Sequence, residues 1–245
     1  MCTSPVARQR TVQWQLNVRR ELVDARTRLI SVVRAITRSQ GYRIAGGATD
    51  TFLTRLAALE LPVSVLESLV PVQSVMELLN RELADADQRF AALVAEDPIV
   101  KRLTTCPSVG PITATAFVAA LDNVHRFAGR RGAAQVTSYL GLVPREYSSG
   151  EQQQRGRVMR SAHPYVRVLL VQAAWRLYRS SDARAAALRT WAQAIARRRG
   201  KNIANVALAR RLARILYAMW RDGIDYQPDR IRSARLDTAA ATPAA

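Results

Sequence analysis

The chain has 245 residues, 49% of them hydrophobic, which is enough to bury a core and excludes a wholly disordered protein. Its formal net charge of +18 predicts a polyanionic partner, and nucleic acid is the one we expect. Two cysteines, Cys2 and Cys106, exclude a disulfide framework, and no apolar run reaches the length of a membrane span, so we expect a cytoplasmic protein with no membrane partner.

The charge is distributed unevenly along the chain. Residues 1–59 carry a net charge of +7, residues 60–97 carry −6, and residues 98–245 carry +17. We therefore expect the nucleic-acid face to lie mainly in the C-terminal part.

A long basic helix is predicted over residues 10–39. Apolar residues recur there at heptad spacing, and Gly41 with the Gly46-Gly47 pair ends the pattern. The predicted seam consists of Val18, Leu22, Ala25, Leu29, Val32 and Ile36.

A second, acidic heptad helix follows and closes at Asp97-Pro98. Its seam consists of Leu69, Val72, Met76, Leu79, Leu83, Ala86, Phe90 and Leu93. Opposite charges on the two helices favour an antiparallel coiled-coil hairpin over residues 1–97, with exposed pairs each contributing about 0.2–1 kcal/mol. Pairing of each helix with another subunit, giving a homo-oligomer, remains the alternative.

Residues 99–126 predict helix, turn, helix, with the turn at Pro107-Ser108-Val109-Gly110-Pro111. This pattern resembles a helix-hairpin-helix element, in which backbone N–H groups meet a phosphate at the next helix's N-terminus. The usual element has glycine where Ser108 stands. An ordinary helix–helix turn is the alternative interpretation.

A short helix is predicted over residues 133–140, followed by Gly141-Leu142-Val143-Pro144. Residues 145–163 are too polar for a core and predict an Arg-rich loop of the kind that carries function. Helices are predicted over 164–179, 183–199 and 202–220, and a disordered tail over 228–245. The predicted fold is mostly α, with a helical hairpin at 1–97 and a helical domain at 98–227.

Several motifs occur in a fixed order between residues 103 and 179. They are Leu103-x-x-Cys106-Pro107-Ser108-Val109-Gly110-Pro111, Arg126-Phe127, Tyr139-Leu140-Gly141-Leu142-Val143-Pro144-Arg145-x-x-Ser148-Ser149-Gly150, Arg157-x-x-Arg160, and Arg167-x-Leu169-Leu170-x-x-Ala173-Ala174-Trp175-x-x-Tyr178-Arg179. In order and spacing they resemble the C-terminal domain of the insertion-sequence 110/116/902 transposase family. The heptad helices resemble the coiled-coil segment of that family.

The resemblance implies a site-specific DNA recombinase guided by an RNA from its own element. A serine of the C-terminal domain attacks a DNA phosphate and forms a covalent protein–DNA intermediate. By motif that serine is Ser149, with Ser148 as the alternative. A serine hydroxyl needs a base or metal to activate it, and arginines can neutralise the developing charge. The candidate DNA-binding residues are Ser108, Val109, Gly110, Arg145, Arg155, Arg157, Arg160, His163 and Arg167.

Three roles are open for His163. It could act as a base, contact a phosphate or have a role at the N-terminus of a helix. It also ends the segment Arg160-Ser161-Ala162-His163, where the family pattern usually reads Lys-x-Gly-Asn.

The family also carries an N-terminal RNase-H-like domain with an acidic metal site. No acidic residue precedes Glu21, and the acids of residues 60–97 lie on a heptad helix. We therefore expect a truncated or split transposase with no cofactor in this chain, Mg²⁺ being expected only with the missing acidic domain.

Three functions remain open from the sequence. The first is a transposase portion that acts through Ser149 when complemented. The second is a non-catalytic nucleic-acid-binding accessory protein, and the third is an interaction protein that oligomerises through its heptad helices.

Overall fold

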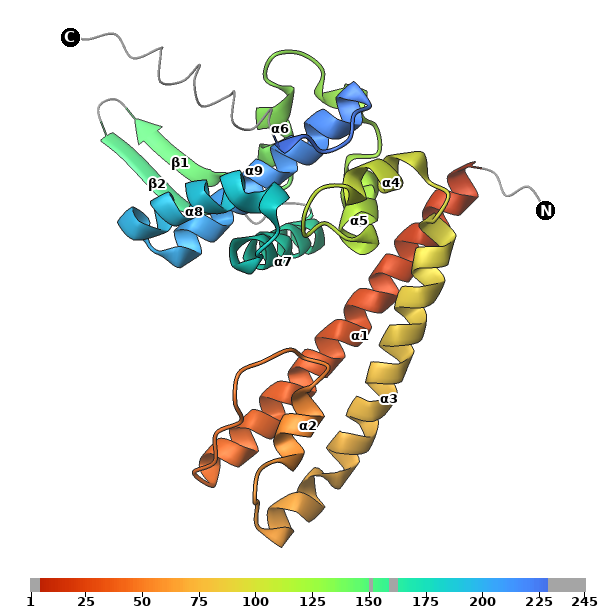
Figure 1. Cartoon of the computed structure of the whole chain (residues 1–245), viewed down its shortest axis with the longest axis vertical. Coiled ribbons are helices and arrows are strands. Elements are labelled where there is room, and N and C mark those ends of the chain that lie inside the picture. Colours follow the sequence, from red (N-terminus) through yellow and green to blue (C-terminus); the bar gives the residue numbers. More distant parts are fainter. Residues whose placement is uncertain (1–4, 150–151, 159–162, 229–245) are drawn as a thin grey trace. The chain divides into compact units, whose positions relative to one another are not determined.

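A computed structural model describes residues 5–149, 152–158 and 163–228, and the chain divides into two compact units, residues 1–93 and 94–245 (Figure 1). The described ranges contain nine α-helices, two short 3-10 helices and one two-stranded sheet, which confirms a mostly α fold. No helix in those ranges is both long and apolar enough to cross a membrane. Of the predicted tail, residues 229–245 lie outside the described part.

The first unit consists of α1 (Pro5–Ser39), α2 (Phe52–Ala57) and α3 (Val63–Val94). Arg19 forms an ion pair with Asp87, and Arg26 Nη1 donates to Asn80 Oδ1 at 3.0 Å. Arg19 and Arg26 are seven residues apart on α1, and their partners on α3 are seven residues apart in the reverse order. The two helices therefore run antiparallel, as Figure 1 shows. The predicted pairing of the basic helix with the acidic helix is confirmed within one chain.

The seam predicted for α3 is confirmed, because all eight of its residues are buried or half-buried. The seam predicted for α1 is confirmed at Leu22, Ala25, Leu29 and Ile36, which are half-buried, and is wrong at two positions. Val18 is 59% exposed and Val32 is 46% exposed, whereas Leu16, Ile30 and Val33 are buried. In the C-terminal half the reason is a second partner, because Ile30 and Val33 belong to a cluster with α2.

The segment between α1 and α3 contains α2, a helix that the sequence analysis did not predict. Its Phe52 and Leu56, one turn apart, are fully buried in the cluster with Ile30 and Val33. Gly41 ends α1 as predicted. Its φ is 81°, and the backbone N–H of Tyr42 donates to Thr37 O at 2.9 Å, the reach-back bond of a glycine-terminated helix.

The second unit packs several helices around α9. In chain order its elements are α4 (Pro98–Thr104), α5 (Pro111–Leu121), the 3-10 helix η1 (Val124–Phe127), α6 (Gly132–Tyr139), strands β1 (Pro144–Ser149) and β2 (Gln152–Val158), α7 (Pro164–Arg179), the 3-10 helix η2 (Ala183–Ala185), α8 (Ala186–Arg199) and α9 (Lys201–Asp222). The predicted helices of this part are confirmed within a few residues.

Helix α9 is the centre of this unit because α6, α7 and α8 all pack against it. Leu208, Leu212 and Leu216 on α9 are completely buried. Polar bonds fix the packing further: the Tyr217 hydroxyl donates to Phe127 O, and Asn205 Nδ2 donates to Val171 O at 3.1 Å. The apolar face of α9 therefore sets the positions of the elements that carry the candidate site.

The prediction of an Arg-rich loop at residues 145–163 is wrong for most of that segment, because residues 144–149 and 152–158 form the antiparallel pair β1–β2. Ser149 pairs with Gln152, Ser148 with Gln153 and Glu146 with Arg155. The strands could not be predicted, because glutamine, serine and arginine carry no apolar alternation that would indicate a strand.

Candidate functional site

The turn between α4 and α5 has the tight geometry that the sequence predicted. Asp97 caps α4 by accepting from the N–H groups of Ile99 at 2.9 Å and Val100 at 3.1 Å. Ser108 adopts a φ of 66°, the left-handed conformation usually taken by glycine. This explains why helix-hairpin-helix elements have glycine where this chain has Ser108.

Gly110 occupies the N-cap position of α5, and no described side chain caps this helix. A Cβ at Gly110 would meet nothing within 4 Å. The side chain of Val109, in contrast, is buried, and its N–H donates to Cys106 O at 3.1 Å. The N–H groups left for a phosphate are therefore those at the open start of α5. Phosphate binding by Ser108, Val109 and Gly110 stays a prediction.

The same turn is tied to the C-terminal elements of the unit. Arg176 Nη2 donates to Ser108 O at 3.2 Å, and Arg184 Nη1 donates to Thr105 O at 3.5 Å. The Tyr226 N–H donates to Thr105 Oγ1 at 2.9 Å. These bonds hold the turn in one place relative to α7 and η2.

Cys106 lies at the start of this turn and is buried. Burial raises the pKa of its thiol to about 12, against a weaker opposing effect from Arg184. A thiol with such a pKa is protonated at neutral pH, so Cys106 has a packing role and is not a candidate nucleophile.

A stack of side chains lies at the root of the β1–β2 hairpin. The ring centroids of Tyr139 and His163 are 4.6 Å apart, and the Arg126 guanidinium carbon lies 5.6 Å from the Tyr139 centroid. Tyr139 ends α6 before β1, and His163 precedes α7 after β2. The stack therefore joins the two ends of the segment that contains the hairpin.

His163 stands at the N-cap position of α7, but its side chain makes no cap bond there. Partial burial lowers the pKa of its imidazole, and the nearby charge of Arg126 lowers it further. The imidazole is therefore neutral at neutral pH and half-buried against Tyr139. Of its three proposed roles, side-chain capping of the helix is not supported.

Part of the Tyr139-Leu140-Gly141-Leu142 motif has a structural explanation. Gly141 has a φ of 65°, its N–H donates to Ser138 O, and the Leu142 N–H donates to Thr137 O, both at 2.9 Å. This is the glycine-ended helix terminus of α6, and the side chain of Leu142 is buried beside it. The motif thus fixes the point at which the chain enters β1.

The hairpin contains five of the eleven predicted site residues. Arg145, Ser148 and Ser149 lie in β1, and Arg155 and Arg157 lie in β2. Ser149 is the last residue of β1, and Arg145 falls at the register shift between Pro144 and Glu146. Arg160 lies outside the described residues. Arg167 is on α7, half-buried, one turn after His163.

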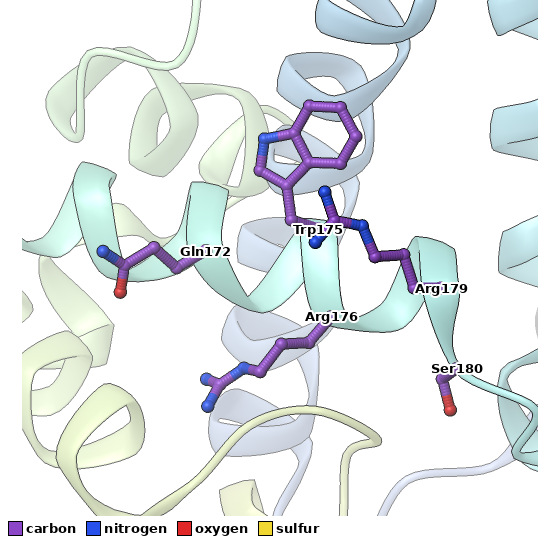
Figure 2. Close-up of a pocket in the computed structure, with 5 residues that line it drawn as sticks. All are labelled: Gln172, Trp175, Arg176, Arg179 and Ser180. Carbon is purple, nitrogen blue, oxygen red and sulfur yellow. The ribbon is translucent and has the colours of Figure 1, made fainter. Parts of the chain in front are cut away.

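The sequence analysis missed one feature, an open cleft of about 510 Å³ on α7 (Figure 2). Gln172, Trp175, Arg176, Arg179 and Ser180 line it. The guanidinium carbon of Arg179 lies 5.2 Å from the Trp175 ring centroid. The spacing of 172, 175, 176 and 179 places them on one helix face, which is all that the sequence could have indicated about this site.

No three His, Cys, Asp or Glu side chains gather into a metal-binding group anywhere in residues 5–149, 152–158 and 163–228. We derive no chemical step through a metal ion.

Comparison with known proteins gives a consistent result. A family model described as "Transposase IS116/IS110/IS902 family" matches residues 100–202. A "probable family 20 transposase" of Pseudomonas aeruginosa is 33% identical over 228 residues, which cover 91% of this chain and 67% of that protein.

Two further relatives match over most of this chain. The transposase for insertion sequence element IS1111A of Coxiella burnetii is 30% identical over 86% of this chain and 58% of its own length. The transposase for insertion sequence element IS1328 of Yersinia enterocolitica is 26% identical over 84% of this chain and 61% of its own length. The chain thus spans about two thirds of the first relative and about three fifths of these two.

Proposed function

Because this chain belongs to the IS116/IS110/IS902 family of transposases, we propose that it binds DNA and attacks a DNA phosphate through the Ser149 hydroxyl during transposition. The observation that carries the proposal is the position of Ser149 at the end of β1, in a hairpin whose second strand contains two arginines. Arg155 lies opposite Glu146, three residues before Ser149, so we expect it to hold a phosphate that neighbours the reacting one.

In the proposed step the Ser149 oxygen forms a bond to phosphorus while the bond from phosphorus to a bridging deoxyribose oxygen breaks. The serine proton passes to a base, and the departing sugar oxygen takes up a proton. The product is a phosphoserine diester that joins the protein to one DNA strand and conserves the energy of the cleaved bond.

Of the two roles left for His163, the geometry favours a role at the root of the hairpin over that of the base for Ser149. His163 contacts Tyr139 near the start of β1, whereas Ser149 is five residues farther along, at its end. A strand rises by about 3.3 Å per residue, which separates the two by on the order of 15 Å. We therefore assign His163 to holding the hairpin root and expect the base to come from elsewhere in the assembly.

DNA is the partner that the charge pattern supports best, since residues 98–245 carry a net charge of +17. A guide RNA and a homo-oligomer are the further partners that we propose. The oligomer is supported by apolar side chains exposed on α3, among them Val70, Val75 and Leu78. Replacing Val70 and Leu78 with lysine should shift the sedimentation coefficient to that of the monomer, and an unchanged coefficient would argue against this face.

The serine assignment is tested with a nicked suicide DNA substrate, Mg²⁺ and a family acidic domain supplied in trans. We expect a protein–DNA adduct that survives denaturing electrophoresis, is lost in Ser149→Ala and persists in the matched control Ser148→Ala. Loss in Ser148→Ala alone would move the nucleophile by one residue.

The second candidate function is a non-catalytic accessory protein that binds nucleic acid, supported by the basic charge of the second unit. It predicts no adduct with either serine intact, together with DNA binding that weakens steeply as salt rises.

A further inference from the structure

The cleft on α7 combines an aromatic ring, two cations and an amide. Trp175 is half-buried, whereas Gln172, Arg176 and Arg179 are exposed. Figure 2 shows the guanidinium of Arg179 reaching toward the Trp175 ring and the side chain of Arg176 directed away from it. Arg176 points to the α4–α5 turn, where it bonds Ser108 O. The volume of about 510 Å³ falls in the range of small-ligand sites, about 300–1,000 Å³.

The positive charge of this cleft is not neutralised by neighbouring acids. Helix α7 contains no acidic residue, and no ion pair joins Arg176 or Arg179 to another described residue. The nearest acid in sequence, Asp182, is held by Arg184, whose hydrogen bonds are the main cause of a lowered Asp182 pKa. Two arginines are therefore available to an anion.

The position of these arginines at the end of α7 has a structural contribution of its own. Cations in the last helical turn are favoured by the helix dipole. The dipole accounts for their charge, but it does not account for the half-buried indole beside Arg179 or for the glutamine one turn before Arg176. A ligand with a flat face and a negative charge matches all four side chains.

We propose that this cleft binds an unpaired nucleotide of a nucleic-acid strand, with the base taking the place of the Arg179 guanidinium on the Trp175 ring and the flanking phosphates held by Arg176 and the released Arg179. Aromatic side chains stack on any exposed base, and arginines track the backbone. A paired base inside a duplex has both faces covered by its neighbours, so the cleft should select single strands. This inference rests on the proposed function only in taking nucleic acid as the ligand.

The contact of Arg176 with the α4–α5 turn links the cleft to the candidate phosphate-binding turn. Arg176 bonds Ser108 O, two residues before Gly110 at the N-cap position of α5. Gln172, one turn before Arg176, adds an amide that can donate to or accept from the edge of that base.

The test uses the fluorescence of Trp175 in the full chain. Trp14, Trp191 and Trp220 are replaced by phenylalanine, which leaves Trp175 as the only indole. We titrate this protein with an oligothymidylate, an oligouridylate and a DNA duplex with the same number of phosphates, and follow binding in parallel by anisotropy of a label on the nucleic acid.

We expect a single strand to quench Trp175 by at least twofold, while the duplex binds without quenching. The DNA and RNA arms distinguish which strand occupies the cleft. An unchanged Trp175 emission on saturation with both single strands would overturn the proposal.

Two variants in the otherwise unchanged chain extend the test. Trp175→Leu should weaken single-strand binding about tenfold and leave duplex binding unchanged, while Arg176→Gln with Arg179→Gln should lower the single-strand salt slope by about 1.4. The matched control Arg214→Gln removes an exposed arginine of α9 and should not change the preference for single strands. If Trp175→Leu keeps the parental single-strand affinity, the cleft is not the site.

These results separate the cleft from the serine chemistry. An adduct at Ser149 without Trp175 quenching refutes the cleft alone. Quenching without an adduct refutes the serine proposal alone.

Discussion

The two units of this chain differ in how many of their large hydrophobic side chains are exposed to solvent. Ten large hydrophobic side chains are exposed among the described residues, and eight of them belong to the helices of the first unit. Those eight are Trp14, Val18, Val32, Val63, Leu66, Val70, Val75 and Leu78. Among the residues of the second unit whose burial is described, only Val168 and Ile203 are exposed large hydrophobic residues, although this unit is the larger of the two.

This difference gives the two units different kinds of surface. The second unit buries its apolar residues around α9 and presents polar and cationic side chains, which suits a nucleic-acid surface. The first unit has an internal seam and an additional apolar surface, which suits association with another protein chain. Variants in each unit can break or sharpen this comparison.

The largest effect is expected in the second unit, from Gly132→Ala. A Cβ at this position would overlap the carbonyl oxygen of Phe127 and the hydroxyl of Tyr217, which bond each other. Because backbone and a buried ring cannot move aside cheaply, we expect the free energy of unfolding to fall by about 3–5 kcal/mol. Urea denaturation followed by circular dichroism measures the change.

Gly110→Ala is the matched control for that experiment. Gly110 also begins a helix, but its Cβ would meet nothing within 4 Å and its φ is −94°. Its free energy of unfolding should change by less than about 1 kcal/mol. Equal losses in the two variants would show that the contact around Tyr217 does not organise the second unit.

In the first unit, two adjacent valines give the sharpest comparison. Val33 is fully buried in the cluster with α2, whereas Val32 is 46% exposed. Val33→Ala should lower the free energy of unfolding by about 1–3 kcal/mol, because it leaves a cavity, and Val32→Ala by less than about 0.5 kcal/mol. Denaturant midpoints measure both. The reverse order would restore the heptad register predicted from the sequence.

The fold could be predicted where a helix has a single unambiguous apolar stripe. The α3 seam and the limits of α7 follow from spacing alone. The register of α1 could not be predicted, because its apolar positions 29–30, 32–33 and 36 form two adjacent stripes, and only the unpredicted helix α2 decides between them. Periodicity finds a helix, but the choice of its buried face depends on the elements around it.

The candidate site was predictable to the level of its chain segments. Motif order indicated the α4–α5 turn and the segment with Ser149, because glycine and proline mark turns in the sequence. It did not indicate that the segment pairs as strands. Nor did it indicate the α7 cleft, because Trp175 and Arg179 read as one apolar and one charged helix position until their stacking is seen.

A smaller effect, of opposite sign, is expected from Ser108→Gly. Ser108 holds a φ of 66°, which is unfavourable for a residue with a Cβ. Its carbonyl oxygen accepts from Arg176, and glycine keeps that oxygen. We expect the free energy of unfolding to rise by up to about 1 kcal/mol, measured by denaturant titration. Ser108→Val, which adds a branched Cβ, is the control and should destabilise. Destabilisation by glycine itself would mean that the serine hydroxyl supports the turn.

The smallest effect concerns the pH dependence of the hairpin root. Burial and Arg126 lower the His163 pKa, so the folded protein binds a proton there less readily than the unfolded chain. The resulting stability is present above the ordinary histidine pKa of about 6.5 and is lost as the pH falls from that value through the lowered one. The unfolding free energy between pH 7 and pH 5 should therefore fall more in the parent than in His163→Phe, which keeps an aromatic ring against Tyr139. Identical pH profiles would mean that the imidazole is not buried at the hairpin root. The contact of His163 with Tyr139 would then not hold the hairpin that carries Ser149.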